Sequence, residues 1–254
     1  MTQSNQVRIS VTKLDGSLWD YAAVSPPSDG EIHVWEFCSE MADWPREDVA
    51  ALLSADERER AARFHFQRDT QRFSVTRARM RSILGMYVRS DSHELKFSYA
   101  ERGKPSLQMK TDLLFNVSHS GDRAVLAIAS AREVGVDIEQ IRDNVECEQL
   151  AERFFSPGER RLIRELDENQ KLTAFFRLWT CKEAFLKAHG AGLSRSLSSF
   201  EVHLGSAPGQ LLRVRGDAEE ERRWSLVELE PPAPYASAAV VDGIIENVRV
   251  FRLE

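Results

Sequence analysis

The segment EVGVDIE (133–139) decides the fold, because it repeats the pattern of EIHVWEF (31–37) at an offset of 102 residues. Two further pairs of segments align at the same offset without gaps: LLSADER (52–58) with FFSPGER (154–160), and RFSVTRARMRSILG (72–85) with AFFRLWTCKEAFLK (174–187). One offset shared by three separated segments indicates an internal duplication. We therefore expect two similar sub-domains that pack about a pseudo-twofold axis.

Each half predicts the same order of elements: a strand, a capped helix, a long helix and further strands. Ser54 with Glu57, and Ser156 with Glu159, have the capping-box spacing that starts helices. The long helices are expected near 70–88 and 171–189, the second ending at Gly190. Strand-like runs follow: LKFSY, LLFNVSHS and AVLAIAS in the first half, and SFEVHL, WSLVEL, ASAAVV and NVRVFRL in the second.

These patterns predict an α+β fold. It is a pseudodimer of two sub-domains, residues 1–130 and 131–254, each with a small, mainly antiparallel sheet packed against helices. Four of the differences between the copies involve the candidate site: Trp35, Phe37, Arg81 and Gly85 of the first half align with Asp137, Glu139, Glu183 and Lys187 of the second. We therefore expect the chemistry to be concentrated in the second copy, with the active site in the cleft between the halves.

Composition narrows the class of protein. The chain has 254 residues, three widely spaced cysteines and a formal charge of −6. It has no cationic, apolar leader and no run of eighteen apolar residues, so we expect a cytoplasmic protein that is not embedded in a membrane. The negative charge argues against general nucleic-acid binding.

Basic residues are nevertheless concentrated in one stretch. Nine arginines fall between Arg58 and Arg89, against only Glu59 and Asp69. Such a band would attract phosphates or an acidic partner, and a solvated helical face is the alternative interpretation. A nucleic-acid binder is a further alternative based on this band alone.

Three acids form a candidate metal site. Alternation of apolar residues in VGVDIEQ (134–140) puts Asp137 and Glu139 on the same side of a strand, roughly 6–7 Å apart. Two like charges at that separation call for a cation between them. On the helix through LWTCKEAFLKAHG, Glu183 and Lys187 are four residues apart and share a face. Three carboxylates make an oxygen-only site suited to Mg²⁺, whereas solvent-facing acids and a surface ion pair are the alternatives.

A polar turn supplies candidate phosphate ligands. The strand FNVSHS (115–120) ends in hydroxyl and imidazole groups at Ser118 and His119 before Gly121. Such a turn can hold a phosphate, although a simple hairpin is the alternative. Upstream, RGKP (102–105) adds Lys104 and a second cation at another turn.

The motifs GKP, FNVSHS, VGVDIE, FFSPGE and LWTCKEAFLKAHGAGLS, in this order, resemble the Sfp-type 4′-phosphopantetheinyl transferases over about residues 58–200. The resemblance implies an enzyme that transfers the phosphopantetheine arm of coenzyme A to a serine of an apo acyl or peptidyl carrier protein and releases adenosine 3′,5′-bisphosphate. It also implies a monomeric pseudodimer. Three acids in the metal set are commoner in bacterial members that serve polyketide or nonribosomal peptide synthesis; fatty acid synthesis is another setting.

The resemblance also assigns roles to residues. Asp137, Glu139 and Glu183 would hold Mg²⁺, with Mn²⁺ as an alternative, and Lys187 would contact the phosphate that is attacked. The coenzyme A ligands would be Arg60, Lys104, Ser118 and His119, with Lys182 as a weaker candidate. The base that takes the serine proton would be Glu183 or Glu159. A non-catalytic coenzyme A or carrier-binding module, and a Mg²⁺ enzyme that hydrolyses a pyrophosphate, are the competing hypotheses.

Overall fold

The computed structural model describes residues 7–14, 24–40, 44–101, 103–190, 195–204, 211–212, 214–215 and 220–253. The first half contains β1 (Arg8–Leu14), β2 (Glu31–Cys38), α1 (Arg46–Leu52), α2 (Ala55–Ala62), α3 (Gln67–Val88), the short helix η2 (Ser92–Glu94), β3 (Phe97–Tyr99), β4 (Pro105–Leu107), β5 (Leu113–Ser120) and β6 (Arg123–Ser130). The second contains β7 (Val134–Gln140), α4 (Cys147–Phe154), α5 (Pro157–Glu165), α6 (Glu168–His189), η4 (Leu197–Ser199), β8 (Glu201–Val202), β9 (Leu211–Leu212), β10 (Val214–Arg215), α7 (Glu220–Arg223), β11 (Trp224–Leu229), β12 (Tyr235–Asp242) and β13 (Asn247–Leu253).

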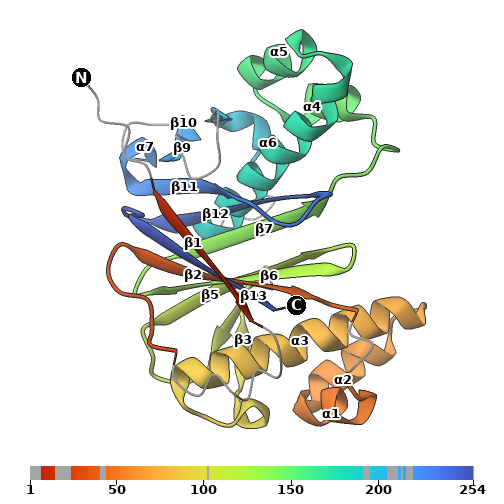
Figure 1. Cartoon of the computed structure of the whole chain (residues 1–254), viewed down its shortest axis with the longest axis vertical. Coiled ribbons are helices and arrows are strands. Elements are labelled where there is room, and N and C mark those ends of the chain that lie inside the picture. The colour runs from red at the N-terminus through yellow and green to blue at the C-terminus, as the bar shows by residue number, and fades with distance from the viewer. Residues whose placement is uncertain are drawn as a thin grey trace.

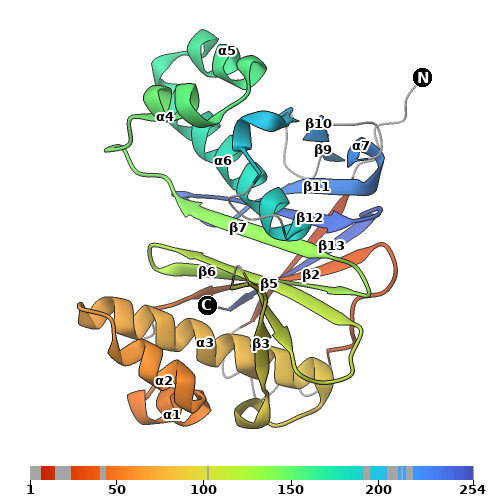
Figure 2. The same ribbon diagram turned by 180° about the vertical axis from the view of Figure 1, so that it is seen from behind.

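Two large sheets lie face to face in the middle of the molecule, and each carries helices on its outer side (Figures 1 and 2). The five-stranded sheet has the order β1-β13-β2-β6-β5 and is covered by α3, with α1 and α2 beyond it. The four-stranded sheet has the order β7-β12-β11-β9 and is covered by α6. This α+β arrangement confirms the predicted fold class.

The duplication is visible in both sheets. The order β2-β6-β5 in the first half corresponds to β7-β12-β11 in the second, and all of these neighbours pair antiparallel. The helices α3 and α6 each have 22 residues. Both begin three residues before the predicted start, because their first turns, QRD and ENQ, are polar and carry no apolar periodicity.

The last strand crosses between the halves. β13 pairs in parallel with β2 and β1, so it belongs to the sheet of the first half although it was assigned to the second. Val248 and Val250 of this strand pack between the two sheets, while Phe251 and Leu253 pack in the core beneath α3. Apolar residues that point to both sides fit a strand that is covered on both faces. The division of the chain at 130/131 itself stays a prediction.

Both predicted helix caps are present. The backbone N–H of Ser54 donates to Glu57 Oε2 at 2.9 Å, and that of Ser156 donates to Glu159 Oε2 at 2.8 Å. α6 ends at Gly190, which has a φ of +72°, as its glycine predicts. In the described part of the chain, no helix combines the length and the apolar character that crossing a membrane requires.

Candidate active site

Helix α6 and strand β7 approach each other closely at Gly135. A Cβ at this position would lie 2.9 Å from the Ala188 Cα and closer still to the backbone of Ala184, so no side chain fits between helix and strand. This approach brings the face of α6 that carries Glu183 and Lys187 against the part of β7 that carries Asp137. Gly135 is a residue that the sequence reasoning did not single out.

Asp137 is the centre of the site. The residue is only 3% exposed, and its Oδ1 atom accepts hydrogen bonds from Lys187 Nζ at 2.6 Å and from Ser118 Oγ at 2.8 Å. Lys187 Nζ also donates to Ser118 Oγ at 2.8 Å, so the three side chains form a closed triangle. The second oxygen, Oδ2, is buried and has no hydrogen-bond partner among the described residues. A buried carboxylate oxygen without a partner is costly unless a ligand completes it.

The other two acids, Glu139 and Glu183, lie close enough to interact electrostatically with Asp137. Burial, followed by the charge of Asp137, raises the pKa of Glu183, and Glu139 adds to this effect. Burial also raises the pKa of Glu139, again with a contribution from Asp137. Removing solvent and adding like charges both disfavour the ionised forms, which is the situation that a bound cation relieves.

The carboxylate oxygens of Asp137, Glu139 and Glu183 do not all lie within one coordination sphere in this structure. Among the described residues, three ligand atoms of His, Cys, Asp or Glu come within 4.8 Å of one another only at the exposed cluster Asp91, His93 and Glu94. In the candidate site, Oδ1 of Asp137 is bonded to the ammonium of Lys187. The oxygen-only donor set and the partnerless Oδ2 fit a Mg²⁺ ion, which prefers oxygen ligands and keeps several waters.

A cleft of about 300 Å³ opens beside this network. Its lining includes four of the predicted substrate-binding or catalytic residues: Arg60, Lys104, His119 and Lys187. The imidazole of His119 is solvent-exposed, yet partial burial by the surrounding protein and the charges of Lys187, Arg72 and Arg60 lower its pKa. Three cations therefore surround this ring, and the cleft is suited to an anion with several phosphates.

Two predicted coenzyme A ligands hold the site together. Lys104 Nζ donates to Glu133 Oε2 at 2.8 Å and to the carbonyls of Val134 and Lys187, both at 3.1 Å. All three of its donors are therefore engaged within the protein. Ser118, 7% exposed, bridges Asp137 and Lys187. In this structure both residues tie the first half to α6 and β7.

Glu159 and Lys182 bond each other inside the protein, away from the cleft. Glu159 is 2% exposed; its carboxylate caps α5 and accepts from Val202 N at 2.7 Å and Lys182 Nζ at 2.9 Å. Lys182 is fully buried and also donates to the carbonyls of Leu197 and Phe200. Neither side chain reaches the cleft, so the interpretations of Glu159 as a base and Lys182 as a coenzyme A ligand are not supported by the geometry.

Several members of the arginine band (58–89) are buried rather than exposed. Arg77 Nε and Arg81 Nε each lie 2.6 Å from an oxygen of Glu57, and Arg81 is only 1% exposed. Arg79 is buried as well, with its guanidinium 4.4 Å from the ring centre of Trp44. These three arginines therefore do not form an exposed basic surface, although Arg77 also lines the cleft. Arg102, the other cation of the RGKP turn, lies outside the described residues.

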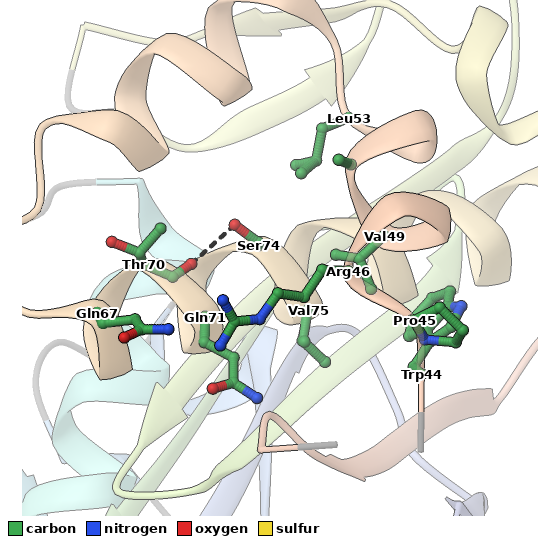
Figure 3. A pocket seen from close by; sticks show the side chains of 11 residues that line it. Trp44, Pro45, Arg46, Val49, Leu53, Gln67, Thr70, Gln71, Ser74 and Val75 are labelled. Carbon is green, nitrogen blue, oxygen red and sulfur yellow. Dashed lines mark hydrogen bonds between the residues drawn. The ribbon is translucent and has the colours of Figure 1, made fainter. Parts of the chain in front are cut away.

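A second hollow, of about 520 Å³, lies between α1 and α3 (Figure 3). Its lining includes Trp44, Val49, Leu53 and Val75, with Gln67 and Gln71 on the side of α3. None of the predicted site residues lines it. We therefore place the chemistry at the smaller cleft, where the charged groups converge.

Comparison with known proteins identifies relatives. Residues 39–131 match the family described as "4′-phosphopantetheinyl transferase, N-terminal", and residues 133–240 match the "4′-phosphopantetheinyl transferase superfamily". The 4′-phosphopantetheinyl transferase HetI of Nostoc sp. is 40% identical over 217 residues, which are 84% of this chain and 88% of the relative. The 4′-phosphopantetheinyl transferase Sfp of Bacillus subtilis is 34% identical over 208 residues, 82% of this chain and 91% of the relative.

Among solved structures, a holo-(acyl-carrier-protein) synthase from Bacillus anthracis is similar with a TM-score of 0.37 and 22% identity. The likeness covers 44% of this chain and 96% of that chain.

Proposed function

Because this chain belongs to the 4′-phosphopantetheinyl transferase superfamily, we propose that the cleft beside Asp137 holds coenzyme A and that the adjacent acids hold Mg²⁺. The protein is an enzyme that transfers the phosphopantetheine arm of coenzyme A to carrier proteins. The assignment of the site rests on the buried Asp137. One of its carboxylate oxygens is bonded to Lys187, and the other has no hydrogen-bond partner among the described residues.

The charges of the cleft support a position for each end of the coenzyme. Arg60 and His119 line the cleft, where they would bind the 3′-phosphate of the adenosine. Lys187 lines the same cleft beside Asp137, where its ammonium would contact the pyrophosphate. Ser118 and Lys104 contribute by fixing Asp137, Lys187 and the backbone around them.

The proposed metal ligands are Asp137, Glu139 and Glu183. A bound Mg²⁺ or Mn²⁺ would neutralise pyrophosphate oxygens and make the phosphorus a better electrophile. For this chain's own residues, the consequence is that three mutually repelling carboxylates could all stay ionised in a partly buried site.

Glu183 is the proposed base. Its carboxylate stands on α6 one turn from Lys187, within electrostatic reach of Asp137, and so beside the phosphate that Lys187 would contact. Glu183 takes the proton of the carrier serine as the serine oxygen forms a bond to the β-phosphorus of coenzyme A. The bond between that phosphorus and the bridging pyrophosphate oxygen breaks, and adenosine 3′,5′-bisphosphate leaves. Lys187 stabilises charge on the reacting phosphate, in keeping with a reaction governed by position and electrostatics.

The acceptor protein, the cellular location and the oligomeric state of the enzyme are also proposals. We infer acyl or peptidyl carrier domains as acceptors and a cytoplasmic, monomeric enzyme without a nucleic-acid or membrane partner. The duplicated fold supports a monomer, because β5 of the first half and β7 of the second supply both walls of one site. For carrier docking, Arg63 and Arg68 are the candidates within the arginine band, because they are exposed whereas Arg77 and Arg81 are buried.

The test is intact-mass spectrometry of an apo carrier protein incubated with the enzyme, coenzyme A and Mg²⁺. We expect the carrier to gain one phosphopantetheine, and we expect EDTA or the Glu183→Ala substitution to abolish the gain. Glu165→Ala, at an exposed position on α5, is the matched control and should leave transfer intact. No gain on several carrier types, although the protein binds coenzyme A, would contradict transfer.

A further inference from the structure

Side chains connect the two sheets where strands β5 and β7 lie side by side, a boundary that we call the seam. β5 and β7 are edge strands of different sheets, yet they lie next to each other between the halves (Figure 2). Three polar residues at alternate positions of β5 reach across: Asn116 Oδ1 accepts from Val136 N at 2.9 Å, Ser118 bonds Asp137, and Ser120 bonds Glu139. Because residues two apart in a strand point the same way, these three side chains form one row along the seam.

Ser120 is fixed in this row from two directions. Its Oγ donates to Glu139 Oε2 at 2.7 Å and accepts from Gln140 N at 3.1 Å. A hydroxyl has one proton to donate, so the backbone contact leaves that proton directed at the carboxylate. The bond occupies one oxygen of Glu139 and restricts the rotation of its side chain. Ser120 does not line the coenzyme cleft.

The turn that follows Ser120 is held by the second half. The backbone N–H of Asp122 donates to Tyr235 Oη at 3.2 Å, and Tyr235 Oη donates in turn to Asp122 Oδ1. Gly121 has a φ of +58°, and a Cβ there would lie 2.5 Å from Tyr235 Oη and 2.7 Å from Gln140 Oε1. A side chain at this position would be strained by the positive φ and would displace the ends of Tyr235 and Gln140.

We propose that Ser120 is a positioning residue for the cation site: it holds Glu139 in place as a ligand, and Tyr235 with Gly121 holds Ser120. This inference rests on the proposed function, because it takes Glu139 to be one of three metal ligands. Glu139 lies next to the end of β7 and lacks the direct lysine contact that fixes Asp137, so its position depends on the neighbouring half of the molecule. Hydrogen-bond partners of metal ligands typically change metal affinity by about 10–100-fold when removed.

The test measures cation binding directly. Mn²⁺ is titrated into the full-length protein with coenzyme A present and carrier absent, and free Mn²⁺ is followed by electron paramagnetic resonance. We expect Ser120→Ala to weaken Mn²⁺ binding about tenfold, and Ser120→Thr, which keeps the hydroxyl, to restore it to within about threefold. Tyr235→Phe should weaken binding in the same direction but less, since the ring still packs. Combined with Ser120→Ala it should add little, because both act through Glu139.

A matched control separates positioning from damage to the fold. Ser130→Ala removes a half-buried hydroxyl that donates to Pro27 O at 2.8 Å outside the site, and should leave Mn²⁺ affinity unchanged. Binding of coenzyme A without divalent cations should be the same in Ser120→Ala and the unmodified protein. In the transfer assay, the Mg²⁺ concentration for half-maximal rate should rise about tenfold in Ser120→Ala, while kcat at saturating Mg²⁺ changes little.

Two results would overturn the inference: Mn²⁺ affinity of Ser120→Ala within twofold of the unmodified protein, or no recovery in Ser120→Thr. Normal transfer to carriers together with either result refutes the positioning role alone. The expected order of Mn²⁺ affinities together with a complete absence of transfer would instead refute the proposed function and leave the cation site.

Discussion

Replacing Gly135 by alanine tests whether the close approach of α6 to β7 sets the geometry of the site. The added Cβ would lie 2.9 Å from the Ala188 Cα and closer to the backbone N of Ala188 and O of Ala184, whereas ordinary contact begins at 3.4 Å. All of these atoms are backbone, so no side chain can rotate away and the helix must retreat by about 1 Å. Overpacking of this kind costs about 1–3 kcal/mol of stability.

The loss of activity should be large and separate from the loss of stability. Moving α6 outward lengthens the 2.6 Å contact of Lys187 with Asp137 and displaces Glu183 with it. Displacement of reacting groups by about 1 Å can reduce the rate roughly 100-fold. We therefore expect kcat/KM of Gly135→Ala to fall about 100-fold, while the melting temperature falls by roughly 2–12 °C, as 1–3 kcal/mol implies for a chain of this size.

The assay compares steady-state transfer rates with thermal unfolding for Gly135→Ala and a control, Gly85→Ala. Gly85 lies on α3 in the first half, where a Cβ would meet Ser90 O at 2.8 Å. The control should lose stability for the same reason but keep its kcat/KM. If Gly135→Ala retained kcat/KM within threefold, or if both variants lost activity in proportion to stability, the proposed role of the close approach would be refuted.

Three further predictions follow from buried or charged groups. Glu57→Gln should lower the free energy of unfolding in urea by about 3–5 kcal/mol, because Arg77 and Arg81 lose their buried partner. The control Glu59→Gln breaks an exposed ion pair and should lower it by less than about 1 kcal/mol. Equal losses in the two variants would contradict this prediction. Glu183→Gln should lower kcat by at least about 100-fold while Glu159→Gln loses stability and keeps most of its activity; equal losses of activity would overturn that ranking. Since burial and neighbouring cations lower the pKa of His119, the free ring is neutral at pH 8 and a bound phosphate favours its charged form, so coenzyme A should bind more tightly as pH falls to 6. Calorimetry should show this gain to be smaller in His119→Gln, and an identical pH dependence in both proteins would exclude the His119 contribution.

The fold could be predicted because its signals are local or repeated. The capping pairs at Ser54 and Ser156 each depend on residues three positions apart, and the long helices carry regular apolar spacing. β1 and the parallel position of β13 were not predicted, because an alternating strand does not reveal which sheet it joins. That choice depends on contacts between distant parts of the chain.

The site was predicted only in part for a related reason. Asp137, Glu183 and Lys187 follow from spacing within one strand and one helix, but Asn116 and Ser120 act across the seam between the sheets. One signal was available: a glycine between two valines in a strand marks a close approach of another backbone, and Gly135 is such a glycine. Burial of Lys182 could not be read from its helix, because its partners lie in η4, the start of α5 and the residue after η4.

The duplicated halves now have different roles, and this difference arises at aligned positions. Where the second half has Glu183 the first has Arg81, whose side chain turns into the core and binds Glu57, the counterpart of Glu159. Where the second half has Asp137 the first has Trp35, which is fully buried against α3. Asp137 is almost as buried, and is tolerated there because Lys187 and Ser118 bond it. Ser118 comes from the first half, so the first copy, although it holds no acids at these positions, still supplies one wall of the site.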